Sequence, residues 1–313
     1  MNINVNFTTL GSGILGQSSH TESVFNYSTV RTALVADAKF ANDITAAGSL
    51  PASSIPLYIN GTSDNPNGSG SLVPYLDNNN SVNNTTVRIT TANQKALRLL
   101  AANATGVDAR ITFKSSFSFD FNPTDGITAG QYDFVGIATH EIGHALGFVS
   151  GVDVLDTNSP GTNGPFLADQ FNYVSTLDLF RFSSDATTAL PGARDWLADT
   201  RAKYFSIDGG NNLVAQFSTG QIHGDGNQAS HWKDNLGIGI MDPTVASGAL
   251  LSISALNTEA EAFDVIGWDL ATVPEPGTMA LCATAIVFLA YRRKKAPATF
   301  AATPSEGRTE PLS

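Results

Sequence analysis

The sequence predicts an α+β fold for residues 1–270, and three observations support this prediction. A segment of alternating apolar and polar residues at 110–121 indicates strand structure with one buried face. Helical spacing of apolar residues before and after it indicates amphipathic helices, and stretches rich in Asn, Gly, Ser and Pro indicate loops. With 313 residues, 42% of them hydrophobic, the chain can bury one large core or the cores of two small subdomains. We expect a twisted sheet and helices in an upper subdomain, about 1–150, and a loop-rich lower subdomain, about 151–270.

Two helices and two strands are predicted before residue 104. Residues 28–44 carry apolar side chains at helical spacing, with Ser28 as the N-cap and Gly48 as the stop signal. A second helix is predicted over residues 91–103. Between the two helices we expect loops around short strands at Ile55–Ile59 and Val87–Ile89.

The alternating segment at 110–121 is the clearest strand signal in the chain. Its apolar residues lie at odd positions: Ile111, Phe113, Phe117, Phe119 and Phe121. This period of two predicts one strand, or a pair of strands, with a single buried face. We also expect its edge to be available for pairing with an extended peptide.

Charge and cysteine content exclude two classes of protein. Seventeen Lys and Arg residues against 28 Asp and Glu give a net charge of -11, so no general basic surface exists for nucleic acid. The single cysteine, Cys282, excludes an intramolecular disulfide and a four-cysteine zinc site. Low charge content and abundant Gly, Asn, Ser and Thr are typical of exported bacterial proteins.

The most informative segment is a short helix predicted between Asp133 and Gly147. Asp133 can cap its N-terminus, and Gly147 can end it with a positive φ angle. His140 and His144 lie one turn apart on this helix, so both imidazoles project from one face and can bind one metal ion. Glu141 is rotated by about 100° from His140, which places its carboxylate near the metal.

This arrangement predicts a hydrolytic zinc site. Zinc with three protein ligands keeps one position open for water, whose pKa falls towards roughly 7. Glu141 can then accept the proton of the water as it attacks a peptide carbonyl, and return that proton to the leaving amine.

The segment from His140 to His144 resembles the zincin metalloproteases. Gly147 extends the similarity to the metzincins, whose longer signature is His-Glu-x-x-His-x-x-Gly-x-x-His. At the third histidine position of that signature this chain has Ser150, which is a poor zinc ligand. The third ligand must therefore lie elsewhere in the chain.

Three candidates remain for the third ligand: Asp153, His223 and His231. Asp153 lies just beyond the helix, and His223 lies in a polar loop. His231 is favoured, because Ser-His-Trp at 230–232 followed by Met241-Asp242-Pro243 resembles the leishmanolysin-like metzincins. In those proteins a long insertion separates the zinc helix from the third histidine. The resemblance implies that Met241 forms a hydrophobic base beneath the site and does not bind metal.

The remaining predicted elements follow the zinc helix. Residues 151–230 would form the insertion, with a hairpin of Tyr204–Ile207 and Leu213–Phe217. Thr258-Glu259-Ala260-Glu261 has the pattern of a capping box that opens a last helix, ending near residues 266–268.

The C-terminal segment resembles the PEP-CTERM sorting signals that exosortases process. Pro-Glu-Pro at 274–276 is followed by an apolar run at 279–291 and by four basic residues at 292–295. The apolar run would span roughly 20 Å as a helix, short of the roughly 30 Å hydrocarbon core, so we expect only transient membrane insertion. The resemblance implies a sorting signal at 271–295 before a polar tail at 296–313.

This signal implies that residues 1–272 reach the cell surface or the extracellular space, with an exosortase-type enzyme as a processing partner. Residues 1–20 have neither the basic nor the apolar region of a signal peptide. We therefore expect the natural start to lie upstream.

We interpret the chain as an exported zinc endopeptidase with a protein or peptide substrate. The alternative is a catalytically inactive surface or adhesion protein that keeps a metal-stabilised fold. Intact Glu141 argues against this alternative, since a purely structural site needs no base. Calcium binding at residues 63–70 is a weaker third interpretation, because the spacing there matches no recognised calcium loop.

Overall fold

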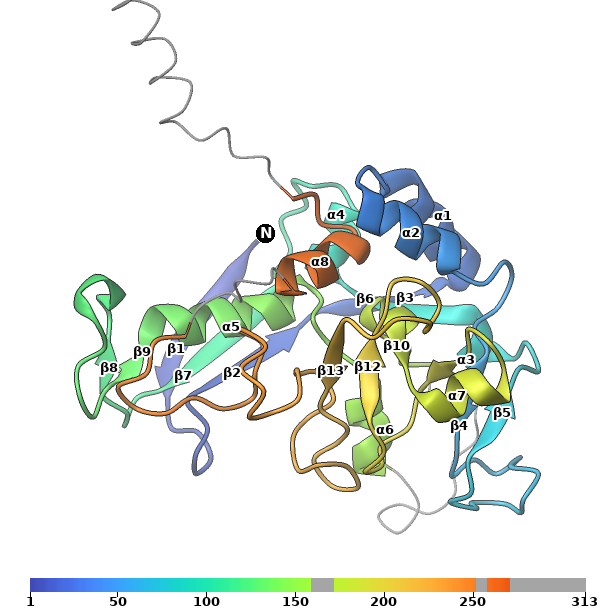
Figure 1. Ribbon diagram of the computed structural model, residues 1–313. Helices are drawn as coiled ribbons and strands as arrows, with labels where there is room; N and C mark the ends of the chain where they lie inside the picture. Colours follow the sequence, from blue (N-terminus) through green and yellow to red (C-terminus); the bar gives the residue numbers. More distant parts are fainter. Residues whose placement is uncertain (159–171, 252–257, 271–313) are drawn as a thin grey trace, which may run out of the picture. The chain divides into compact units, whose positions relative to one another are not determined.

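The computed structural model of the protein describes residues 1–158, 172–251 and 258–270 (Figure 1). Residues Met1–Leu270 form one compact unit of mixed α+β structure, with small sheets and several helices, so the predicted class is confirmed. Within the described ranges no helix is long and apolar enough to cross a membrane. The predicted sorting signal, its apolar run and the polar tail lie outside the described residues.

The sheet that contacts the helix carrying His140 and His144 has three strands, in the order β1-β7-β2. Strand β7 (Ala109–Lys114) pairs in parallel with β1 (Ile3–Thr8) and antiparallel with β2 (Gly16–His20). Because β7 is the central strand, the prediction of a free edge is wrong for residues 110–114. The edges of this sheet are β1 and β2, and β2 is the edge strand that contacts α5.

The alternating segment at 110–121 forms two strands that belong to different sheets. After β7 the chain turns, and β8 (Phe119–Asp120) pairs in parallel with β9 (Tyr132–Asp133). The phenylalanines of both parts nonetheless meet, because Phe113 and Phe119 both contact Phe134 at ring centroid distances of 4.8 and 5.6 Å. The odd-numbered face is therefore buried at Ile111 and Phe113, half-buried at Phe117 and Phe119, and exposed at Phe121.

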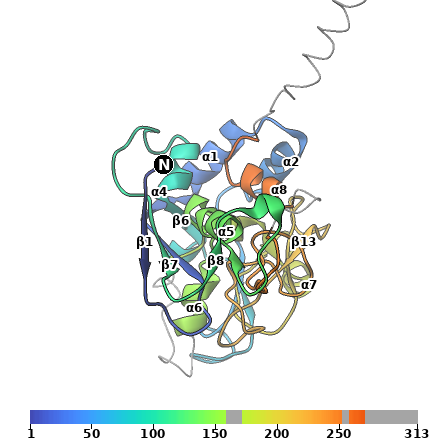
Figure 2. The same cartoon turned by 90° about the vertical axis from the view of Figure 1, so that its left-hand side faces the viewer.

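Helix α5 (Phe134–Leu146) packs against β2 and β7, as Figures 1 and 2 show. Asp133 accepts a hydrogen bond from the Gly136 N–H at 2.9 Å, and Gly147 adopts a left-handed conformation with φ of 119°. Both predicted ends of this helix are confirmed. Ile137 of α5 packs on the sheet in a small separate core.

The first predicted helix is in fact two helices. Strand β3 (Glu22–Asn26) leads directly into α1 (Tyr27–Asp37), so Ser28 lies inside the helix and is not its N-cap. The chain then breaks before α2 (Ala41–Ser49), because the carboxylate of Asp43 accepts the Lys39 N–H at 2.7 Å. The apolar spacing continues through the break and could not reveal it.

The second predicted helix is shorter than expected. Helix α4 covers Thr91–Ala96, and Arg98 then takes a positive φ of 59°. The N–H groups of Leu99 and Leu100 both turn back to the carbonyl of Gln94. This turn provides hydrogen-bond partners for the carbonyl groups at the end of the helix, so the helix ends well before residue 103.

The other elements are short and connect through long loops. They are β4 (Leu57–Ile59), β5 (Tyr75–Asp77), α3 (Val82–Thr85), β6 (Thr86–Thr90), a 3-10 turn (Pro123–Asp125), α6 (Val152–Asn158), a 3-10 turn (Leu177–Phe180), β10 (Arg181–Phe182), α7 (Ser184–Ala189), β11 (Arg194–Asp195), β12 (Lys203–Phe205), β13 (Ala215–Phe217) and α8 (Thr258–Val265). Strands β12 and β13 form the predicted hairpin. Helix α8 includes Thr258, whereas the capping-box pattern predicts that Thr258 is the N-cap outside the helix. Helix α8 packs on α2.

A large core joins elements from both halves of the sequence. It contains residues of α1, β4 and β6 together with residues of β12, β13 and α8. Near the edge of this core, Lys95 and Asp108 form a buried ion pair with a nitrogen to oxygen distance of 2.8 Å. The same carboxylate accepts the Asn2 N–H at 2.6 Å, which fixes the first strand to α4.

Candidate metal centre

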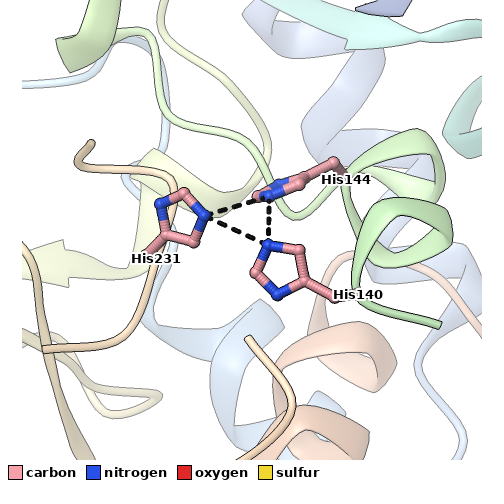
Figure 3. A group of neighbouring side chains, drawn as sticks. All are labelled: His140, His144 and His231. Atoms are coloured by element: carbon pink, nitrogen blue, oxygen red, sulfur yellow. Dashed lines mark hydrogen bonds between the residues drawn. The ribbon is translucent and has the colours of Figure 1, made fainter. Parts of the chain in front are cut away.

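Three histidines from two distant segments converge at one point (Figure 3). The Nε2 atoms of His140 and His144 on α5 lie 3.1 Å apart, and each lies 3.2 Å from Nε2 of His231. Within the part of the chain that the structure describes, these three form the group of His, Cys, Asp and Glu side chains close enough to hold one ion.

Backbone carbonyls determine the tautomer of each imidazole. Nδ1 of His140 faces the carbonyl of Ile240 at 2.7 Å, and Nδ1 of His144 faces that of Phe148 at 2.8 Å. Nδ1 of His231 faces a carbonyl at 3.3 Å. A carbonyl oxygen can only accept, so each Nδ1 carries the proton and each Nε2 presents a lone pair to the centre.

Burial keeps the three rings neutral. It lowers the pKa of His140, lowers that of His144 well below the usual value, and lowers that of His231 to about 3. Proximity to the other imidazoles contributes to the lowered pKa of His144 and of His231. Three neutral rings whose Nε2 atoms lack protons cannot hydrogen-bond to one another, and a cation between them would satisfy all three.

The spacing of the three nitrogens fits a first-row transition metal. A tetrahedral zinc ion with Zn–N bonds of about 2.0–2.1 Å separates its nitrogen ligands by about 3.3–3.4 Å. The observed separations of 3.1–3.2 Å are close to this value. Carbonyl-supported imidazoles are also the ligand arrangement that such metals take in proteins.

Glu141 lies beside the histidines, between α5 and the edge strand β2. Its side chain is buried, and burial raises its pKa to about 7, although a hydrogen bond from the Ser18 N–H acts in the opposite direction. Glu141, His140 and His144 border the same cleft, so the carboxylate faces the space in front of the histidines.

Asp153 holds the segment that carries His231. Its carboxylate accepts the N–H of Ala229 at 2.6 Å and the N–H of Ser230 at 3.2 Å, and the Ser230 hydroxyl donates to it as well. The structure therefore places Asp153 behind the third histidine and not among the converging nitrogens. Trp232, the next residue, is fully buried and stacks on Phe217 at a centroid distance of 4.9 Å.

Met241 lies beneath the histidine-bearing helix. Its side chain is fully buried, and a Cβ atom added at Gly143 would lie only 2.5 Å from the Met241 sulfur. The Trp232 N–H donates to the Met241 carbonyl at 3.0 Å, which links this turn to the segment of the third histidine. The glycine between the two helix histidines thus allows the methionine to approach the helix backbone closely.

The other residues considered from sequence are not among the converging side chains. His223 donates its N–H to Asp156 at 2.8 Å and is not one of the converging histidines. The Ser150 hydroxyl donates to Asp178 at 2.6 Å. In the 63–70 stretch, the buried amide of Asn65 donates to two backbone carbonyls, so it closes the loop.

The histidines open on a cleft of about 770 Å³. The apolar and aromatic residues that line it include Phe117, Tyr132, Ile137, Val245 and Leu251. The polar residues that line it include His20, Arg88, Tyr173, Ser175 and Gln228. Strand β2 contributes Gly16, Ser18 and His20 to the same lining. Sequence reasoning missed these three, because the segment Gly-Gln-Ser-Ser-His has no apolar alternation that would indicate a strand.

Comparison with known proteins identifies the C-terminal segment. Residues 272–294 match the PEP-CTERM protein-sorting motif. This motif indicates export to the cell surface and recognition by an exosortase, as the sequence predicts. No curated protein matches the chain. No solved structure matches it either.

Proposed function

We propose that residues 1–270 are the catalytic part of an exported zinc endopeptidase with a metzincin-like arrangement. The observation that supports this most strongly is the convergence of three carbonyl-supported imidazoles beside a buried glutamate, at the bottom of a cleft. His140, His144 and His231 would hold the zinc ion. Bound zinc supplies Lewis acidity, which activates water and polarises a peptide carbonyl.

Glu141 is the general base and acid in this proposal. A base works best when its pKa lies near the working pH, and burial brings the pKa of Glu141 to about 7 in the metal-free protein. The carboxylate accepts the proton of the attacking water and returns it to the nitrogen of the leaving amine. The peptide bond breaks as the amine is protonated.

The free edge of β2 offers a binding strand for the substrate. Leu15 accepts from Lys114 and Thr21 donates to Asp108, so odd-numbered residues of this segment bond to β7 and its continuation. The N–H and C=O groups of Gly16, Ser18 and His20 consequently point away from β7. An extended peptide in the cleft can pair with this edge through Gly16, His20 and the Ser18 carbonyl, since the Ser18 N–H faces Glu141.

Three further features support the metzincin-like assignment. The third histidine comes from a segment distant in sequence from the helix that carries the first two. The chain turns at Gly147 after the second histidine, and Met241 packs closely against this helix at Gly143. A purely structural zinc site would not need a buried carboxylate in the same cleft.

Metal analysis and casein digestion with the full chain would test the function. We expect about one zinc per chain, and proteolysis that a chelator abolishes and zinc restores. Glu141→Gln should keep zinc and the melting temperature while lowering hydrolysis by several orders of magnitude, because only the proton acceptor is lost. Glu261→Gln, on α8, is the matched control and should behave like wild type.

One result would favour the non-catalytic surface protein instead. A zinc-loaded chain that cleaves no protein substrate, with Glu141→Gln indistinguishable from wild type in every assay, would contradict the peptidase proposal and leave the metal centre in place.

A further inference from the structure

A glycine at the start of the edge strand borders the carboxylate of Glu141. A Cβ atom added at Gly16 would lie 2.6 Å from Glu141 Oε1, 3.0 Å from Cγ and 3.1 Å from Cδ. The end of the glutamate side chain therefore occupies the space that any side chain at position 16 would need.

The backbone at Gly16 does not itself require glycine. Gly16 is absent from the residues with positive φ, and it lies in regular antiparallel pairing with Phe113 of β7. Glycine in a strand costs about 0.5–1 kcal/mol relative to alanine. The three atoms nearest to such a methyl group all belong to Glu141.

Ser18 completes the surroundings of the carboxylate. It lies two residues along the same strand, on the same face as Gly16, and its N–H donates to Glu141. This N–H belongs to the side of β2 that does not pair with β7, as derived above. The carboxylate is thus held between a position without a side chain and a backbone donor of one strand.

We propose that Gly16 and the Ser18 N–H are positioning groups for Glu141, which fix its carboxylate on the strand edge that also receives the substrate. This inference rests on the proposed function and adds the device that sets the base relative to the peptide. One strand then determines both the register of the bound peptide and the location of the proton acceptor. A displacement of about 1 Å at a reacting group can cost about 100-fold in rate.

The variant Gly16→Ala separates positioning from folding. The clash involves the far end of a flexible side chain, so rotation of Glu141 relieves it without moving the backbone. We expect an unchanged melting temperature, a zinc dissociation constant within about twofold of wild type, and a KM changed less than kcat. The value of kcat should fall by about 10- to 100-fold.

Two controls isolate the effect. Gly106→Ala adds the same methyl group where nothing lies within 4 Å and φ is not positive, so it should leave every parameter unchanged. In a Glu141→Gln background, Gly16→Ala should lower the residual rate no further, because both changes act on the same group.

A second measurement does not depend on activity. The Ser18 amide resonance of wild type should show the downfield proton shift of a charge-assisted hydrogen bond, and Gly16→Ala should move it upfield, as should Glu141→Gln. Wild-type kcat and an unmoved Ser18 resonance in Gly16→Ala would overturn the inference. So would a parallel loss of zinc affinity, melting temperature and rate, which would mean a structural role. If wild type hydrolyses nothing, the proposed function fails, and the amide resonance alone decides whether Gly16 positions the carboxylate.

Discussion

Replacing Asp153 by asparagine would test how the third histidine is held. The carboxylate accepts three hydrogen bonds from Ala229 and Ser230, directly before His231. Asparagine keeps the shape of the side chain but has only one acceptor oxygen. If that oxygen keeps the shorter bond to Ala229, at 2.6 Å, the amide nitrogen faces the N–H of Ser230, a donor against a donor.

The structure sets the expected size of the effect. Ser230 is buried, and a buried N–H left without an acceptor costs about 1–3 kcal/mol. Without the carboxylate, the segment before His231 would leave its position more often in the metal-free protein. Loss of such an outer contact typically lowers metal affinity by about 10- to 100-fold, which is about 1.4–2.8 kcal/mol.

The assay is zinc competition with a chromophoric chelator at pH 7.5, above the pKa of about 6 to which burial raises Asp153. Asp156→Asn is the matched control, because Asp156 lies on the same helix, one turn later, and accepts N–H groups of Ile222 and His223. It should lower stability without changing the zinc affinity of the folded protein. Unchanged zinc affinity in Asp153→Asn, or an equal loss in Asp156→Asn, would refute the reasoning. Loss as severe as in His231→Ala would indicate that Asp153 is itself a ligand.

Further predictions concern the ligand set, the helix contact and the buried ion pair. His231→Ala should lower zinc affinity and peptide hydrolysis together, whereas His223→Ala should change neither, as isothermal titration and a peptide assay would show. Gly143→Ala places a methyl group 2.5 Å from the sulfur of Met241 and should destabilise the protein by about 1–3 kcal/mol in urea, with normal unfolding contradicting the close contact. Asp108→Asn should cost about 3–5 kcal/mol at pH 7. Burial raises the pKa of Asp108, but its hydrogen bonds lower the pKa by more, so that the pKa in the folded protein lies below 3.8. The destabilisation caused by Asp108→Asn should therefore be constant above pH 3.8 and shrink as the pH falls through the lower pKa of the folded protein.

The sorting segment could be recognised without any structure, because a processing enzyme recognises it as a linear signal. Its three parts must occur in order along the chain, and the match at 272–294 agrees with the prediction. The histidine-bearing helix could also be predicted, since its causes are local. The cap at Asp133, the left-handed Gly147 and the spacing of the two histidines all act within four residues.

Helix lengths and sheet position were decided by contacts that the local pattern does not contain. Helical spacing runs through residues 38–40, yet the Asp43 side chain accepts a backbone N–H there and ends the helix. The alternation at 110–121 shows that one face is buried, but it carries no information about which strands pair on either side. Pairing with β1 and β2 made β7 central, and the polar strand β2 became the edge beside the cleft.

The sequence alone was sufficient for the two helix histidines, the glutamate between them and the order of candidates for the third nitrogen. Only the tertiary structure brought His231, 87 residues beyond His144, to within 3.2 Å of it. The reason is physical: helix geometry is set by neighbours three or four residues apart, whereas the place of His231 depends on the Asp153 carboxylate and on the packing of Trp232 against Phe217. The same long-range packing brought Gly16 against Glu141, a contact that no local pattern in either segment indicates.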